Sequence, residues 1–215
     1  MDSFAQFLQD IEKTSHRLDA HKIEAFDRYR DEIRRVNTLL GLVSRNDVDR
    51  IPSRHFLDSL MPALSGVLPT GGTILDIGSG GGFPGIPLAI FLPDTDFVLV
   101  ESSRKKCAFL RKIRRLLVLN NVTVEHTRAE SLTEQGRLYD GAVSRAVTSI
   151  GQLATWSGCV LKPGGRLISY KGPKPEKETE SARTVIESQG MVLEGIHRYD
   201  EDAPGSPTLV VLRKR

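Results

Sequence analysis

The stretch TILDIGSGGGFPGIP, residues 73–87, decides the fold that the sequence predicts. An apolar run ending at Ile77 stops at a cluster of glycines, and a second apolar segment covers residues 86–92. This order predicts a strand, a tight turn and a helix. Glycines permit positive φ angles and a close approach to a ligand, and amides before a helix suit nucleotide-like or carboxylate groups. The stretch therefore predicts a nucleotide-binding loop, although similar runs also form plain turns.

Two acids flank this loop in sequence. Glu101 ends the apolar run 97–100, about twenty residues beyond the glycines, where doubly wound folds place the acid that accepts hydrogen bonds from ribose hydroxyls. Asp76 lies inside the first apolar strand. Because a buried carboxylate needs partners, we expect it to accept loop amides or to reach a ligand amine. The simpler alternatives are a solvated carboxylate for Glu101 and a structural cap for Asp76.

Length and composition limit the class of protein. A chain of 215 residues holds one α/β domain of ordinary size and an extra subdomain. Cys107 and Cys159 are too few and too far apart for a disulfide framework or a metal cluster, so we expect no metal and a reducing cytoplasm. No apolar run approaches the length of a membrane span. The net charge is only +3, so a nucleic-acid partner requires a local concentration of Lys and Arg.

The first third of the chain predicts helices. Apolar residues recur at three and four residues between Phe4 and Leu40, which is helical spacing. A short helix bracketed by Pro52 and Pro62 precedes the first strand, and in it His55 and Asp58 share one face. We therefore expect a helical N-terminal subdomain over residues 1–65 and a second domain over residues 66–215.

A basic helix follows Glu101. Residues 104–115 carry a buried apolar stripe, and the opposite face contains Lys105 and Lys112 among other basic residues, with no acid. A charged face is usually solvated, but one without interspersed acids is equally consistent with phosphate contacts.

The rest of the chain alternates strands and helices. Further strands are expected at 122–126, 140–144, 167–170, 191–196 and 208–212, with a turn at 161–166, a helix through Ser188 and an acidic loop at 200–205. Arg145 follows the fourth strand, in the crevice where such sheets bind ligands. The last two strands are joined without a helix, so the final strand is expected to be antiparallel. This seven-stranded pattern resembles the class I S-adenosylmethionine-dependent methyltransferase (Rossmann-like) fold more than a dehydrogenase.

Five separate motifs then resemble one family. They read RHFLDS (54–59), LDIGSGGGFPGIPLA (75–89), VESSRKKxxFL (100–110), AVSRAV (142–147) and YKG (170–172). Together they resemble the RsmG family, also called GidB, whose members are 16S ribosomal RNA guanine-N7 methyltransferases. At residues 41–43 the chain reads GLV where the family carries NLT or NLS.

The resemblance implies a cofactor, a partner and a set of site residues. The cofactor is S-adenosylmethionine, and the partner is 16S ribosomal RNA in the 30S particle or a precursor, acted on in the cytoplasm by a monomer without metal. Cofactor contacts are implied for Gly78, Phe83, Glu101, Ala129, Glu130 and Arg145, to which the pattern of the glycine loop adds Asp76 and Gly80. The RNA-facing side is implied to hold Arg54, His55, Asp58, Arg128 and Lys171, to which the basic helix adds Lys105 and Lys112.

The chemistry of this reaction agrees with what the sequence lacks. Guanine N7 has a free lone pair and no proton, so methyl transfer needs alignment and no general base. The sequence has neither the Asn/Asp-Pro-Pro-aromatic run of amino-group methylators nor a Pro-Cys nucleophile. Arg145 is the candidate for the reaction centre, assigned to phosphate or cofactor carboxylate contact, with a salt bridge at the sheet end as the alternative. The competing functions are a same-fold methyltransferase of protein or small molecules, a dehydrogenase and a non-catalytic RNA-binding protein.

Overall fold

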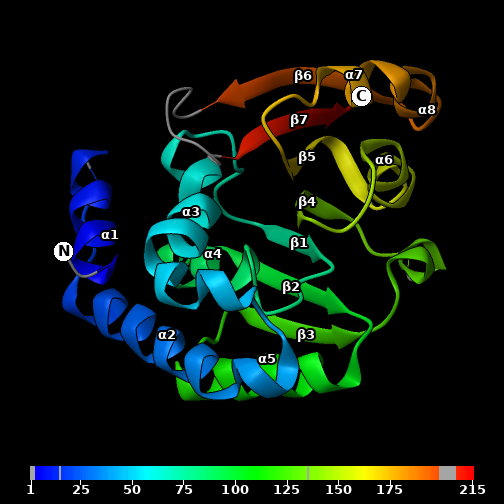
Figure 1. Ribbon diagram of the computed structural model, residues 1–215. Helices are drawn as coiled ribbons and strands as arrows, with labels where there is room; N and C mark the ends of the chain where they lie inside the picture. The colour runs from blue at the N-terminus through cyan, green and yellow to red at the C-terminus, as the bar shows by residue number, and fades with distance from the viewer. Residues whose placement is uncertain (1–2, 15, 135, 199–206) are drawn as a thin grey trace.

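One seven-stranded sheet forms the centre of the protein (Figure 1), in the order β3-β2-β1-β4-β5-β7-β6. The computed structural model describes residues 3–14, 16–134, 136–198 and 207–215. The strands are β1 Thr73–Ile77, β2 Asp96–Glu101, β3 Val122–His126, β4 Tyr139–Arg145, β5 Leu161–Lys171, β6 Met191–Arg198 and β7 Thr208–Lys214. Strands β1 to β5 pair in parallel, and β7 is antiparallel to both β5 and β6. The predicted seven-stranded fold with an antiparallel last strand is confirmed.

Helices cover both faces of the sheet (Figure 1). Side chains alternate along each strand, so Ile74 packs into one hydrophobic cluster and Leu75 into another. The first cluster is covered by α1 Ser3–Lys13, α2 Ala20–Leu40, η2 Ile51–Phe56, α3 Leu57–Leu64, α4 Gly85–Phe91 and α5 Arg104–Leu116. The second is covered mainly by η3 Ala129–Glu134, α6 Ile150–Gly158 and α8 Arg183–Ser188. The remaining helices are η1 Arg45–Arg50 and α7 Glu176–Ser181.

The N-terminal region contains two helices, α1 and α2, where the sequence predicted helical structure from Phe4 to Leu40. Asp19 begins α2 by accepting a hydrogen bond from the Lys22 amide (2.8 Å). Helix α2 ends at Gly41, whose φ of 57° is the left-handed conformation of a glycine cap. The Asn37 side chain then accepts the Leu42 and Val43 amides (2.8 and 2.9 Å). The segment that departs from the family pattern is therefore a well-bonded helix end.

Two predicted helix boundaries are wrong. The segment around Arg54–Leu60 is helical, but Pro52 and Pro62 lie inside the helices that they were expected to bracket. Pro52 occupies the start of the π-helical turn η2, where a missing amide proton removes no helical hydrogen bond. The helix predicted to run through Ser188 is divided at Ala182 into α7 and α8.

Strand β5 is longer than predicted. It begins at Leu161, because residues 162–165 form an irregularity within the strand instead of a turn before it. The register with β4 shifts there, from Tyr139 opposite Leu161 to Gly141 opposite Arg166. This shift absorbs the extra residues and keeps Leu167 and Ile168 in the two cores.

The N-terminal helices share a core with the rest of the chain. Phe7, Tyr29 and Phe56 belong to the same buried cluster as Phe97 and Ile168 of the sheet. The predicted boundary near residue 65 stays a prediction, and the predicted acidic loop at 200–205 lies outside the described residues. Of the helices in the described ranges, none has the length and apolarity needed to cross a bilayer.

Tyr29 connects α2 to the glycine loop, and loss of its hydroxyl group is expected to destabilise the protein. Its wholly buried hydroxyl donates a 2.6 Å hydrogen bond to the Gly81 carbonyl. Tyr29→Phe keeps the ring but leaves that carbonyl unpaired, so we expect a loss of about 1–3 kcal/mol in the free energy of unfolding. Urea unfolding with an unchanged m-value would measure it. An unchanged midpoint would mean that this bond contributes nothing.

Candidate functional site

The glycine loop is fastened to the carboxyl end of β2. The amides of Gly78 and Ser79 both donate to the Val100 carbonyl (2.9 and 3.0 Å). Gly78, Gly80 and Gly82 have φ angles of 73°, 56° and 101°. These left-handed conformations explain why glycine occupies the turn. The loop of residues 78–82 is thus held at the carboxyl end of the sheet, where β1 and β2 end. We call the surface that it forms there the ledge.

The glycines of the loop serve two different purposes. A Cβ atom on Gly82 would lie 2.5 Å from the Tyr29 hydroxyl, and one on Gly85 would lie 2.5 Å from Asp76 Oδ2. These two glycines allow close packing within the protein. A Cβ on Gly80 would meet nothing nearer than the Gly78 carbonyl at 3.8 Å. Gly80 therefore borders open space, where a bound group can approach the backbone.

Asp76 is a wholly buried carboxyl group beneath the loop. Its Oδ2 accepts the Gly85 amide (3.1 Å), which confirms the expected contact with a loop amide. Its Oδ1 has no hydrogen-bond partner among the described residues, because the nearby Ser79 hydroxyl donates to the Asp76 main-chain carbonyl (3.1 Å). Burial raises the pKa of Asp76 to about 7, against the opposing effects of Ser79 and the Gly85 amide.

Glu101 closes the other side of the ledge. Its carboxylate accepts the Gly80 amide (2.9 Å) and the Ser103 amide (2.7 Å). Each oxygen retains a further acceptor position. Glu101 is opposite His126 in the β2–β3 register, so Ala129 and Glu130 at the start of η3 follow the same edge of the sheet. The predicted cofactor residues that follow β1, β2 and β3 thus lie together at the carboxyl end of the sheet.

Phe83 belongs to a buried aromatic cluster. Its ring is 8% exposed and lies 5.7 Å from Tyr29, 5.1 Å from His55 and 6.2 Å from Phe56 between ring centroids. Phe83 is therefore not free to stack on an RNA base. Its predicted contact with the cofactor stays a prediction.

His55 is held neutral at the edge of this cluster. Burial, followed by the charge of Arg145, lowers the pKa of His55 to about 4. Its Nε2 is buried without a hydrogen bond and lies 3.8 Å from Asp47 Oδ2. His55 is thus a neutral, mostly buried imidazole and makes a poor phosphate ligand.

Arg145 and Asp58 meet at the carboxyl end of β4. Arg145 Nη2 donates to Asp58 Oδ2 (2.9 Å), and both side chains are mostly buried. Burial raises the pKa of Asp58 to about 6, although Arg145 acts in the opposite direction. The salt bridge that the sequence left as the alternative for Arg145 is present. The pair lines a cleft of about 420 Å³ that also contains Arg54 and Lys171.

Lys171 is anchored on one side of that cleft. Its Nζ donates to the Thr148 carbonyl and to Glu178 Oε1, both at 2.8 Å. Glu178 Oε1 also accepts the Ile150 amide (2.8 Å), which joins α7 to the start of α6. Lys171 therefore supports the loop after β4 as well as lining the cleft.

The basic helix α5 is less uniform than its sequence indicates. Lys105 is exposed, but Lys112 forms an ion pair with Glu32 of α2. Arg104, Arg111 and Arg115 are exposed and form no ion pair with any described acid. At spacings of seven and eleven residues they lie on one face. Arg128 is also exposed, after β3.

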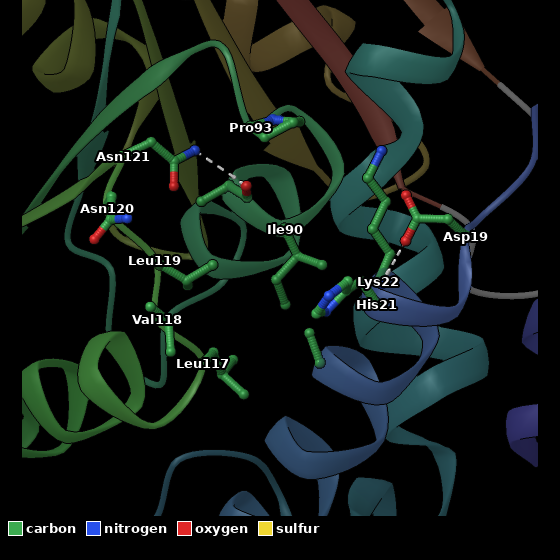
Figure 2. A pocket seen from close by; sticks show the side chains of 12 residues that line it. Asp19, His21, Lys22, Ile90, Pro93, Leu117, Val118, Leu119, Asn120 and Asn121 are labelled. Atoms are coloured by element: carbon green, nitrogen blue, oxygen red, sulfur yellow. Dashed lines mark hydrogen bonds between the residues drawn. The ribbon is translucent and has the colours of Figure 1, made fainter.

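A second cavity, of about 370 Å³ (Figure 2), lies at the amino end of β3, opposite the carboxyl strand ends that carry the glycine loop. It is lined by the start of α2, including Asp19 and Lys22, and by residues 117–121 before β3. Asn121 Nδ2 donates to the Ala89 carbonyl in its wall (3.1 Å). Residues before β3 belong to the amino end of the strand, so this cavity is remote from the glycine loop. Within the described ranges, no group of three His, Cys, Asp or Glu side chains could hold a metal ion.

Comparison with known sequences decides the family. Residues 22–204 match the family described as GidB, rRNA small subunit methyltransferase G. The chain belongs to the GidB family. A GidB relative named ribosomal RNA small subunit methyltransferase G, from Roseiflexus sp. (strain RS-1), is 40% identical over 202 residues, which cover 92% of this chain and 86% of the relative. A second, from Lachnoclostridium phytofermentans, is 35% identical and covers 97% and 88%. The resemblance predicted from the five motifs is confirmed.

Solved structures share the fold of this GidB chain. The crystal structure of M. jannaschii TYW2 in complex with AdoMet matches with a TM-score of 0.58 and 17% identity, covering 80% of this chain and 76% of that one. TrmN from Thermus thermophilus matches with a TM-score of 0.57 and 17% identity, covering 74% and 48%. At this identity the likeness concerns the fold alone.

Several residues of the site were missed from sequence. Tyr29 and Glu32 lie in α2, where their spacing marked them only as parts of an amphipathic helix. Ser169 lines the cleft from inside β5, and its buried Oγ has no hydrogen-bond partner among the described residues. Val147, which a Cβ on Gly78 would meet at 2.5 Å, ends the AVSRAV motif, but the motif alone gave it no role at the glycine loop. Only the three-dimensional structure brings these side chains to the loop and the cleft.

Proposed function

We propose that this protein transfers a methyl group from S-adenosylmethionine to N7 of a guanine in 16S ribosomal RNA, within the 30S particle or a precursor. Membership of the GidB family makes it an S-adenosylmethionine-dependent methyltransferase of small-subunit ribosomal RNA. The observation that supports methylation at guanine N7 is that a space for the cofactor and a space for the base lie side by side. The open ledge at Gly80 and the cleft at Asp58 occupy neighbouring strand ends, since β1 lies beside β4.

The ledge fits S-adenosylmethionine. Gly80 leaves space where a ligand can meet the backbone, and Glu101 retains acceptor positions that suit ribose hydroxyls. Ala129 and Glu130 at the start of η3 would flank the adenine, and Gly78 would lie beside the methionine part. TYW2, which shares this fold, was crystallised in complex with AdoMet. When bound, the cofactor supplies a methyl group on a positively charged sulfur.

The residues of the protein need only align the reactants. Guanine N7 carries a lone pair and no proton, so no side chain has to remove one. Holding two reactants in line contributes about 7–11 kcal/mol towards the barrier. Arg145, paired with Asp58, lines the cleft in which the base would be oriented, while His55 stays neutral because of its lowered pKa of about 4. Product formation leaves positive charge on the purine, so a carboxylate near the base is more useful than a general base.

The experiment that tests this function uses tritiated S-adenosylmethionine. The purified protein is incubated with 30S particles, naked 16S RNA or free nucleosides, and the RNA is digested to nucleosides. We expect label in 7-methylguanosine from particle RNA. Label in another nucleoside would refute the N7 assignment, and no label in any RNA would refute the RNA substrate.

The exposed face of α5 is proposed to contact RNA phosphates. Arg104, Arg111 and Arg115 carry unpaired charge on one face, whereas the charge of Lys112 is already balanced by Glu32. The double reversal Arg111→Glu with Arg115→Glu is expected to weaken binding to 30S particles at least about tenfold at low salt and to lower the salt slope by about 2.

A matched control distinguishes this from a general effect of charge. Lys13→Glu with Arg183→Glu makes the same change of charge on exposed residues of α1 and α8. Affinity for S-adenosylhomocysteine should be unchanged in both double variants. If the α5 variant bound particles as well as the control does, this face would be a solvated surface.

A further inference from the structure

The cleft beside the glycine loop has the position expected of the pocket for the target base. It is formed by Arg54 and Asp58 from the η2–α3 segment, Arg145 at the end of β4 with Val147 after it, and Ser169 and Lys171 from β5. Its volume of about 420 Å³ is in the range of small-molecule sites. Val147 is shared with the loop, because a Cβ on Gly78 would meet it at 2.5 Å. Val147 therefore lies both in the wall of this cleft and beside the Gly78 end of the ledge.

The polar groups of the cleft are unevenly distributed. Asp58 is the single acid among the described residues that line it. Its Oδ2 accepts Arg145 Nη2 (2.9 Å), and its Oδ1 accepts no hydrogen bond from a described residue. Ser169 Oγ, which belongs to a residue only 1% exposed, also lacks a partner. Buried polar groups without partners are uncommon, so Ser169 Oγ is an unused position for a ligand. Asp58 Oδ1 offers the cleft a further acceptor.

The chemistry of guanine matches this arrangement. Guanine presents two adjacent donors, N1–H and N2–H, on its Watson–Crick edge, and proteins read unpaired RNA bases on that edge. A carboxylate is an acceptor-only group with two oxygens, so it complements two adjacent donors. Adenine would present the lone pair of N1 to the same carboxylate and would be repelled. Guanine N7 lies on the other edge, so a base held by N1 and N2 turns N7 away from Asp58.

We propose that Asp58 determines specificity for guanine by accepting N1–H and N2–H of the target base, while Arg145 holds the carboxylate in position. This inference rests on the proposed function and specifies the recognition in the same active site. Arg145 is thereby a positioning residue, which meets Asp58 of α3 at the end of β4 through a mostly buried ion pair.

The test replaces the target guanosine with inosine, which keeps N7, O6 and N1–H but lacks the N2 amino group. Once the labelled guanosine has been mapped, ligated 16S RNA with guanosine or inosine at that position is assembled into 30S particles. For the wild-type protein we expect kcat/KM to be about tenfold to a hundredfold lower for inosine, the discrimination typical of a good base contact. For Asp58→Asn we expect a lower rate on guanosine and a guanosine-to-inosine ratio near one.

Controls separate base recognition from damage to the fold. Asp47→Asn changes another carboxylate of the same region, which lies 3.4 Å from Arg54 and does not line the cleft. It should keep the wild-type ratio. Asp58→Asn should bind S-adenosylhomocysteine as the wild type does, and Asp58→Ser answers the same question should the Asn variant unfold.

The outcomes are distinct. If the wild-type protein treats inosine and guanosine alike, or if the Asp58 variants keep the wild-type ratio, the inference is overturned. If the wild-type protein labels no guanosine at all, the proposed function fails before the role of Asp58 is tested.

Discussion

Gly80→Val is expected to abolish binding of S-adenosylhomocysteine, with a loss of affinity of at least about a hundredfold. The Cβ position of Gly80 lies in open space, with only the Gly78 carbonyl within 4 Å, at 3.8 Å. In the proposed function the ligand occupies that space, so a valine side chain would displace it. A loss of this size corresponds to about 2.8 kcal/mol. Isothermal titration calorimetry measures it directly.

The control must carry the same backbone strain. Gly80 has a φ of 56°, which a β-branched residue adopts only at a cost. Gly136 has a φ of 64° and nothing within 4 Å of its Cβ position. Gly136→Val therefore imposes similar strain away from the ledge and should bind the ligand normally. Wild-type affinity in Gly80→Val would refute the placement of the cofactor.

Asp76→Asn is expected to alter how stability depends on pH. Burial raises the pKa of Asp76 from its ordinary value of 3.8 to about 7. Between these two values the folded protein keeps a proton that the unfolded chain releases, so the contribution of Asp76 to stability falls as pH rises. Above pH 7 both states are ionised and the contribution becomes constant. The limiting slope is about 1.4 kcal/mol per pH unit.

The measurement compares the two proteins by urea unfolding from pH 4 to pH 8. Subtracting the variant removes the contributions of all other titrating groups. We expect the free energy of unfolding of the wild type, minus that of Asp76→Asn, to decrease up to about pH 7 and then to level. A difference that increases with pH would mean that the folded protein favours the ionised carboxylate.

The periodic features of the sequence predicted the fold well. The strand-glycine-helix order at residues 73–87 and the absence of a helix before the last strand predicted the class of sheet and its antiparallel β7. Local signals failed where tertiary contacts decide. Residues 162–165 contain a turn signal, but Leu161 and Arg166 on either side of them pair with β4, so these residues form an irregularity within β5. Pro62 lies inside α3 although a proline usually marks a boundary.

The sequence predicted which residues belong to the site better than it predicted which residues they contact. The charges of Arg145 and Lys112 were evident, but their partners Asp58 and Glu32 lie 87 and 80 residues away in sequence. Such distant pairs leave no local pattern. Phe83 followed the glycines as a ligand residue would, yet its ring packs against Tyr29, which no motif marked. A sequence shows which groups are available, and packing decides which remain free.

The central claim is that cofactor and base lie over neighbouring strand ends. A crystal structure of the protein with S-adenosylhomocysteine tests it most directly. We predict density over the ends of β1 and β2, with ribose hydroxyls bonded to Glu101 and the cleft at Asp58 left free for the base. Density in the Asp58 cleft, or in the cavity of Figure 2 at the amino end of β3, would contradict the account.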